Sequence, residues 1–229
     1  MIRFLKKVAS EIKFWWVLPV YGVIYMILFY LVEHRTGVTY TILQVPLDTI
    51  IPFCEYFIIP YELWFVCILA TGLFLLLVNR DPGDYYRFSA SMIIGMSIFI
   101  AVSFIFPNMQ VLRPHYFAHD NIFVDMVKSI YAADTSTNIF PSIHVYNSMV
   151  MYFALKECKM LKGKKLINAG VLLMAISIIL STMFLKQHSA LDVTFALVLN
   201  FAVYATIYQP EKVTGTERRR AGDLLSKKA

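Results

Sequence analysis

The sequence predicts an all-α, polytopic membrane protein in which six transmembrane helices form one bundle with extracytoplasmic loops. Of its 229 residues, 59% are hydrophobic and only 16% are charged, whereas a soluble domain has about 45–50% apolar and about 25% charged residues. Apolar runs of the roughly 20 residues needed to cross a hydrocarbon core of about 30 Å recur along the chain. A soluble protein with one cleaved signal peptide is therefore excluded.

Six apolar stretches are expected to span the membrane, and they cover residues 15–32, 61–78, 88–106, 141–155, 166–185 and 188–208. A further apolar stretch, 41–60, contains three prolines together with Asp48 and Glu55. Prolines break helices, and carboxylates are costly in lipid. We therefore expect an interfacial or re-entrant segment at 41–60 instead of a span.

The chain is expected to have three parts. Residues 1–14 interleave basic and apolar residues at helical spacing, which is typical of an amphipathic helix on the cytoplasmic leaflet. Residues 15–208 form the six-span domain, which is expected to carry the chemistry. Residues 209–229 form a basic cytoplasmic tail of polar composition.

The basic residues predict the orientation of the spans. With six spans, 17 of the 21 Lys and Arg residues fall on the side of the two termini, and only Arg35, Arg113, Lys128 and Lys186 fall on the other. Basic residues concentrate on the cytoplasmic side, so both termini are expected in the cytoplasm. The net charge of +6 thus sets orientation and gives no reason to expect nucleic-acid binding.

The longest polar stretch, residues 107–140, is then an extracytoplasmic loop with too few apolar residues to span. Long loops of this kind usually carry function. Within it, His115 and His119 have a spacing that metal ligands use, but no third ligand is apparent. No metal site is expected.

A histidine and a carboxylate stand four residues apart where the fifth and sixth spans meet. His188 and Asp192 would be neighbours on a helix. A carboxylate at one ring nitrogen fixes the tautomer of a histidine, so that the other nitrogen presents a lone pair and can act as a nucleophile. The alternative is that the two side chains merely satisfy each other near the membrane surface, although ionisable groups within a membrane are usually functional.

Other polar residues on the same side suggest anion binding. Pro141, Ser142 and His144 open the fourth span, where a helix N-terminus favours anions and a second histidine could protonate a leaving group. Arg113, followed by Pro114, supplies a guanidinium of the kind that clamps phosphate oxygens. Each residue alone is weak evidence, and a histidine at a span start is more often structural.

Together these residues resemble the three signature motifs of the type-2 phosphatidic acid phosphatase superfamily. Those motifs read K-x6-R-P, P-S-G-H and S-R-x5-H-x3-D, and the chain is similar to them in order and spacing over residues 106–192. The resemblance implies that His188 is the nucleophile that becomes phosphohistidine, Asp192 its orienting partner and His144 the general acid. It also implies that Arg113, Ser142 and Ser181 hold the phosphoryl group, and that no metal or cofactor is needed.

Three positions depart from the family pattern, because Phe106, Ile143 and Thr182 replace the motif lysine, glycine and arginine. Two phosphate-binding cations are therefore missing. A phosphomonoester, which carries about −1.5 to −2 charge, needs such cations more than a diester does. Lys186, two residues before His188, is the candidate that would restore one charge, and its alternative role is a membrane-interface anchor.

The resemblance implies a membrane lipid phosphatase that hydrolyses phosphatidic acid, a polyprenyl phosphate or another lipid phosphate at the extracytoplasmic face. Two alternatives remain open. One is a head-group phosphotransferase of the sphingomyelin or inositol phosphorylceramide synthase type, with a lipid alcohol as acceptor. The other is a catalytically silent scaffold or transporter. The sequence selects neither the lipid nor the oligomeric state.

Overall fold

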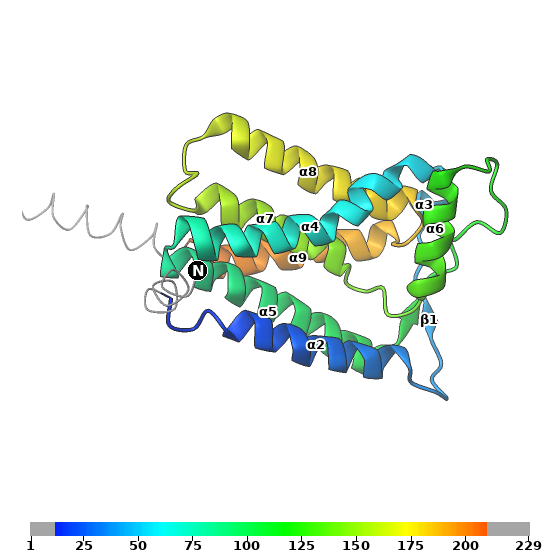
Figure 1. Ribbon diagram of the computed structural model, residues 1–229. Coiled ribbons are helices and arrows are strands. Elements are labelled where there is room, and N and C mark those ends of the chain that lie inside the picture. The colour runs from blue at the N-terminus through cyan, green and yellow to red at the C-terminus, as the bar shows by residue number, and fades with distance from the viewer. Residues whose placement is uncertain (1–11, 210–229) are drawn as a thin grey trace, which may run out of the picture.

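The computed structural model describes residues 12–209 and is mostly helical. Six helices run side by side along one axis (Figure 1), namely α2 (Val17–Glu33), α4 (Ile58–Leu73), α5 (Pro82–Ile105), α7 (Ile143–Glu157), α8 (Lys165–Phe184) and α9 (Ala190–Ile207). A π-helical turn, η2 (Phe74–Asn79), extends α4. Residues 1–11 and 210–229 lie outside the described residues, and they include most of the predicted amphipathic helix and of the predicted tail.

Four helical segments are long and apolar enough, by length and composition, to cross a membrane: Glu55–Asn79, Pro82–Ile105, Lys165–Phe184 and Ala190–Ile207. Helix α2 is apolar but has 17 residues, and α7 has only 15. These apolar helices are compatible with an integral membrane protein, and the count of six spans stays a prediction.

Helix α7 occupies the centre of the bundle. It packs against α4, α5, α8 and α9, and most of its side chains are buried. It lies close against α5, where a Cβ atom added at Gly95 would lie 1.9 Å from the Tyr146 ring. The Tyr146 hydroxyl donates to the Ser91 carbonyl oxygen at 2.8 Å, and Asn200 of α9 donates to the Tyr146 carbonyl oxygen at 3.0 Å. These contacts fix the position of the first turn of α7 relative to α5 and α9.

Short elements cover one end of the bundle (Figure 1). They are α3 (Pro46–Ile50), the 3₁₀ turn η1 (Glu55–Phe57), α6 (Ile122–Ala133) and a two-stranded parallel pair, β1 (Thr41–Ile42) with β2 (Asn108–Met109). The stretch 41–60 thus contributes to this end, and its carboxylates are satisfied within the protein: Asp48 is 3% exposed and Glu55 5% exposed.

Helix α6 is a difference from the sequence prediction, which had a loop throughout 107–140. The Asn121 side chain caps the helix by accepting from the Val124 amide at 3.0 Å. Val124 and Val127, three residues apart, bury one face against the bundle. One apolar stripe is enough for a helix that lies across the bundle end, although it is too little for a span.

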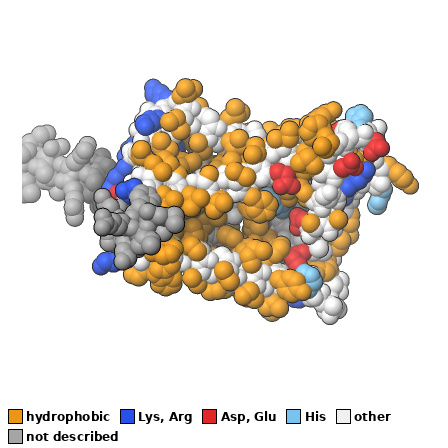
Figure 2. Space-filling model, viewed as in Figure 1, with side chains coloured by type: hydrophobic (Ala, Val, Ile, Leu, Met, Phe, Trp, Pro, Cys, Tyr) orange, Lys and Arg blue, Asp and Glu red, His pale blue; other side chains and the backbone are white. Residues whose placement is uncertain are grey.

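Charge is separated along the bundle axis. Figure 2 shows Lys and Arg side chains mostly toward the end where the described chain begins, and Asp, Glu and His toward the end that carries α3 and α6. The sequence predicted that Lys and Arg gather at one end, and the described residues agree; it made no prediction for the acidic residues and histidines. Which end faces the cytoplasm stays a prediction.

Candidate active site

The His188–Asp192 pair forms at the start of α9. Ser189 is the N-cap of this helix, and its hydroxyl accepts from the Leu191 amide at 3.2 Å. His188 therefore precedes the helix, whereas the sequence predicted that it would lie on the helix. The pair still forms, with 2.5 Å between His188 Nδ1 and Asp192 Oδ2. Because an ionised carboxylate only accepts, Nδ1 carries the proton and Nε2 presents its lone pair.

His144 faces this lone pair from the first turn of α7. Its Nδ1 lies 3.4 Å from His188 Nε2. The rings of Tyr61 and Trp64, both from α4, pack on His144 with centroid distances of 4.7 and 4.4 Å. The two histidines, 44 residues apart in sequence, therefore meet directly at the cavity wall, and both line the cavity described below.

The turn that carries His188 is held by the segment 46–51. The Asp48 carboxylate accepts from the Ser189 hydroxyl at 2.6 Å and from the Ala190 amide at 2.7 Å. The Lys186 ammonium donates to the carbonyl oxygens of Asp48 and Ile51, and the Lys186 backbone has a positive φ of 52°. These contacts fix the residues on both sides of the histidine.

Three predicted phosphate-binding residues have other partners in this structure. Lys186 binds the carbonyl oxygens just described, and burial lowers the pKa of its ammonium, opposed by the Asp48 carboxylate. The Ser181 hydroxyl donates to the Ile178 carbonyl oxygen at 2.6 Å, and Ser142 is the N-cap of α7, accepting from the Val145 amide at 3.4 Å. None of the three lines the cavity described below. Their contact with phosphate stays a prediction.

The Arg113 guanidinium is enclosed by oxygen atoms. It donates to the carbonyl oxygens of Tyr131, Asp134 and Thr135 at 3.1, 2.9 and 2.9 Å. A fourth hydrogen bond, 2.6 Å long, goes to the side-chain oxygen of Gln187. Burial lowers its pKa, although nearby acidic groups oppose the effect. Arg113 joins the loop after α6 to the residue before His188.

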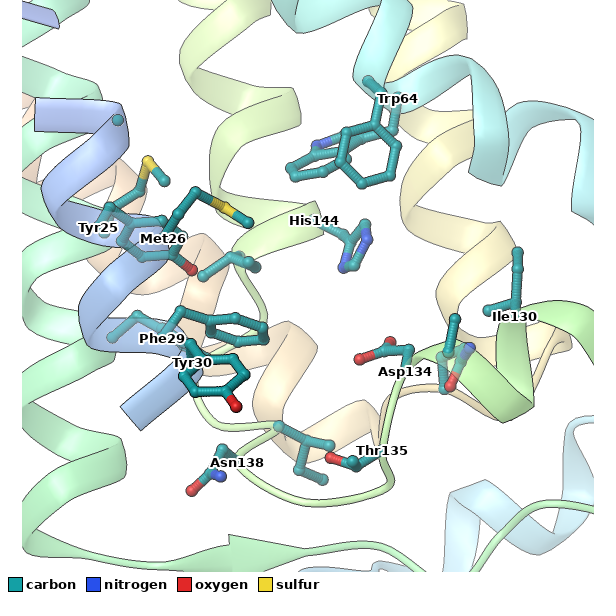
Figure 3. Close-up of a pocket in the computed structure, with 18 of the residues that line it drawn as sticks. Tyr25, Met26, Phe29, Tyr30, Trp64, Ile130, Asp134, Thr135, Asn138 and His144 are labelled. Carbon is teal, nitrogen blue, oxygen red and sulfur yellow. The ribbon is translucent and has the colours of Figure 1, made fainter. Parts of the chain in front are cut away.

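A cavity of about 1000 Å³ opens onto the two histidines. Figure 3 shows His144, Asp134, Thr135 and Asn138 at one end, with Tyr25, Met26 and Phe29 of α2 and Trp64 of α4 around the remainder. His188 and Gln187 also line it. Its rim includes Met26 and Phe65, each 62% exposed, so the cavity opens between α2 and α4 toward the apolar flank of the bundle.

The cavity lining is acidic where it is charged. It contains Glu62 and Asp134, and no Lys or Arg is found among its lining residues within the part of the chain described. The Asp134 carboxyl points into the cavity (Figure 3). Burial raises its pKa, opposed by His188, by Arg113 and by a hydrogen bond from the Tyr61 hydroxyl.

Sequence reasoning missed three residues of this site: Asp48, Asp134 and Gln187. Asp48 was noticed only as a carboxylate unsuited to lipid, and that cost was the available signal of a buried partner. Asp134 stands in the long polar stretch 107–140, where nothing in the local sequence distinguishes it from the other acidic residues. Gln187 had no signal apart from standing next to His188.

The site thus combines a buried histidine–aspartate pair, a second histidine and a largely apolar cavity within a helical bundle. The profile of the PAP2 superfamily matches residues 87–213, more than half of the chain. The protein belongs to this superfamily, whose members are in general hydrolases acting on phosphate esters. No curated protein and no solved structure matches the chain.

Proposed function

We propose that the protein is a membrane enzyme that cleaves the phosphate ester of a lipid through a phosphohistidine intermediate, with water as the acceptor. The observation that carries the proposal is the meeting of His188 Nε2 and His144 Nδ1, 3.4 Å apart, with Asp192 behind the first histidine and an apolar cavity in front of both.

The first half-reaction forms the covalent intermediate. The lone pair on His188 Nε2 attacks phosphorus, and the bond between phosphorus and the lipid oxygen breaks. His144 donates a proton to the leaving lipid alkoxide. Asp192 stabilises the positive charge that develops on the His188 ring.

The second half-reaction returns the enzyme to its starting state. His144, now lacking that proton, accepts one from the incoming water as the oxygen attacks phosphorus. The bond between phosphorus and His188 Nε2 breaks, releasing inorganic phosphate. The proton given to the lipid is thereby replaced by one from water.

The cavity supports a lipid substrate. Most of its lining is apolar, from α2, α4 and α5, and its rim lies between α2 and α4. A lipid in the bilayer would enter sideways, keeping its chains among apolar residues while its head group reaches the histidines. The resemblance to the lipid phosphatases agrees with this entry.

Head-group transfer is a second candidate, and the acidic lining favours it. A phosphomonoester would bring about −1.5 to −2 charge next to Glu62 and Asp134, in a cavity whose described lining contains no Lys or Arg. A phosphodiester brings one formal charge and suits the cavity better. A lipid alcohol would then replace water in the second half-reaction.

One assay separates the candidates. Phosphate release and labelled head-group transfer are measured together on a panel of lipid monoesters and diesters, with wild type, His188→Ala and His119→Ala. Hydrolysis predicts phosphate release that His188→Ala abolishes and His119→Ala preserves. Transfer predicts an acceptor-dependent lipid product with the same dependence on His188. If neither product depends on His188 across the panel, the proposed function is wrong.

A further inference from the structure

Gln187, beside the candidate site, carries a buried hydrogen-bond donor without a partner among the described residues. The residue is 3% exposed and lines the cavity immediately before His188. Its Nε2 atom has no hydrogen-bond partner among residues 12–209. Buried polar atoms are nearly always paired, so an unpaired amide beside a cavity indicates a ligand that accepts hydrogen bonds.

The orientation of this amide is fixed by Arg113. A guanidinium has five donors and no acceptor, so the atom that contacts Arg113 Nη2 at 2.6 Å has to be the Gln187 oxygen. Nε2 is then on the opposite side of the amide. The guanidinium is itself held by the backbone carbonyl oxygens of Tyr131 in α6 and of Asp134 and Thr135 just after it. The Gln187 backbone amide donates to the Thr182 carbonyl oxygen at 2.9 Å.

We propose that Gln187 is a catalytic residue whose Nε2 donates a hydrogen bond to a non-bridging phosphoryl oxygen, and that Arg113 is a positioning residue that aims this donor. The inference rests on the proposed function and adds a phosphate-binding group to it. Charge collects on the phosphoryl oxygens in the transition state, where a preoriented donor is most effective.

This role differs from the direct phosphate clamp that the family resemblance implies for Arg113. Arg113 does not line the cavity, and its two terminal nitrogens already make four hydrogen bonds. The buried Nε atom of Arg113 has no partner among the described residues, but a clamp that used either terminal nitrogen would require some of these bonds to break. Acting through Gln187, Arg113 keeps all of them while a neutral donor meets the phosphate.

Two substitutions of Gln187 test the donor. Gln187→Glu keeps an oxygen facing Arg113 but removes the N–H group, and Gln187→Met removes donor and acceptor without adding charge. We expect both to lower kcat about 10²–10³-fold, as loss of one such donor does in other enzymes. The melting temperature of Gln187→Glu should be no lower than that of wild type. Gln44→Glu, at an exposed position, is the charge-matched control and should keep full activity.

The outcomes are distinct. If Gln187 only anchors Arg113, Gln187→Glu keeps its activity and the proposal is overturned. If charge alone matters, Gln187→Glu is inactive while Gln187→Met stays active, which also overturns it.

Arg113 is tested by a double-mutant cycle. In the wild-type background, Arg113→Met is expected to lower kcat. In the Gln187→Met background, adding Arg113→Met should lower kcat by less than about threefold further, because the effect of Arg113 passes through the amide. A direct clamp predicts that the two losses multiply, and that result would contradict the positioning role.

Binding of orthovanadate, a phosphate analogue, separates this proposal from the proposed function. Vanadate should raise the melting temperature of wild type and His119→Ala, and should fail to raise that of Gln187→Met. Activity that depends on His188 together with unchanged vanadate binding and turnover in Gln187→Met overturns the role of Gln187 alone. Absence of both turnover and vanadate binding in wild type overturns both proposals.

Discussion

Two histidine–carboxylate pairs lie at the same end of the bundle and differ in their surroundings. His188 Nδ1 and Asp192 Oδ2 are 2.5 Å apart, and His119 Nδ1 and Glu55 Oε1 are 2.7 Å apart. The His188 side chain is 8% exposed, whereas that of His119 is 62% exposed. The free nitrogen of His188 faces a second histidine and a cavity that His119 does not line. A pair alone is no indication of catalysis, and what the other nitrogen faces decides its role.

The two pairs should differ most when their carboxylates are replaced. Asp192→Asn should lower kcat about 10³–10⁴-fold, because an amide can donate to Nδ1 and select the tautomer that blocks Nε2, as in serine protease triads. Glu55→Gln should leave kcat within about twofold. Turnover of the lipid substrate measures both, and equal effects at the two positions would break the comparison.

The loss of turnover caused by replacing His144 is expected to be larger for a poorer leaving group. His144→Ala should lower lipid turnover about 10²–10⁴-fold, the usual contribution of a general acid. With an aryl phosphate, whose leaving group needs no proton, the loss in the first half-reaction should be much smaller. Burst kinetics on both substrates check this. A loss of the same size on both would argue against the acid role.

The Asp134 carboxyl is expected to make the stability of the fold depend on pH. Burial raises the pKa of its carboxyl, so folding favours the protonated form. The cost is absent below the ordinary Asp pKa of about 4 and develops as pH rises through the folded-state pKa. Asp134→Asn should therefore raise the melting temperature by several degrees at neutral pH. The gain should vanish near pH 4, and a gain independent of pH would contradict this origin.

The smallest effect is expected at the exposed pair. His119→Ala should lower the melting temperature by at most about 2–4 °C, because the His119 side chain is 62% exposed, although Glu55 is buried. An ion pair with an exposed partner contributes about 0–1 kcal/mol, and about 1 kcal/mol corresponds to that shift in a chain of this size. Asn121 still donates to Glu55 at 3.2 Å. Thermal unfolding in detergent measures the change, and a large drop would show that this pair carries more of the fold than its exposure indicates.

The sequence predicted the parts of the site that local spacing encodes. His188 and Asp192 stand four residues apart, and the N-cap Ser189 brings them together even though His188 lies outside the helix. The family motifs supplied His144. All six predicted apolar stretches correspond to helices of the structure, although their number as membrane spans stays a prediction.

What the sequence could not supply depends on segments far apart in the chain. Asp48 holds Ser189 across 141 residues, and Arg113 holds Gln187 across 74. No periodicity encodes such contacts, because they form only when the bundle closes. Lys186 shows the same limit: its sequence position suggested a phosphate ligand, and the fold directs its ammonium to the carbonyl oxygens of α3 and the residue after it.

In the proposed mechanism His188 carries the phosphoryl group during turnover. Wild type and His188→Ala would be mixed with a lipid labelled in its phosphoryl group, quenched in alkali within the turnover time and digested, and the peptides analysed for the label. We expect a label that is stable in alkali, lost in acid, located on His188 and absent from the variant. Turnover with no label on His188, and continuing in His188→Ala, would contradict it.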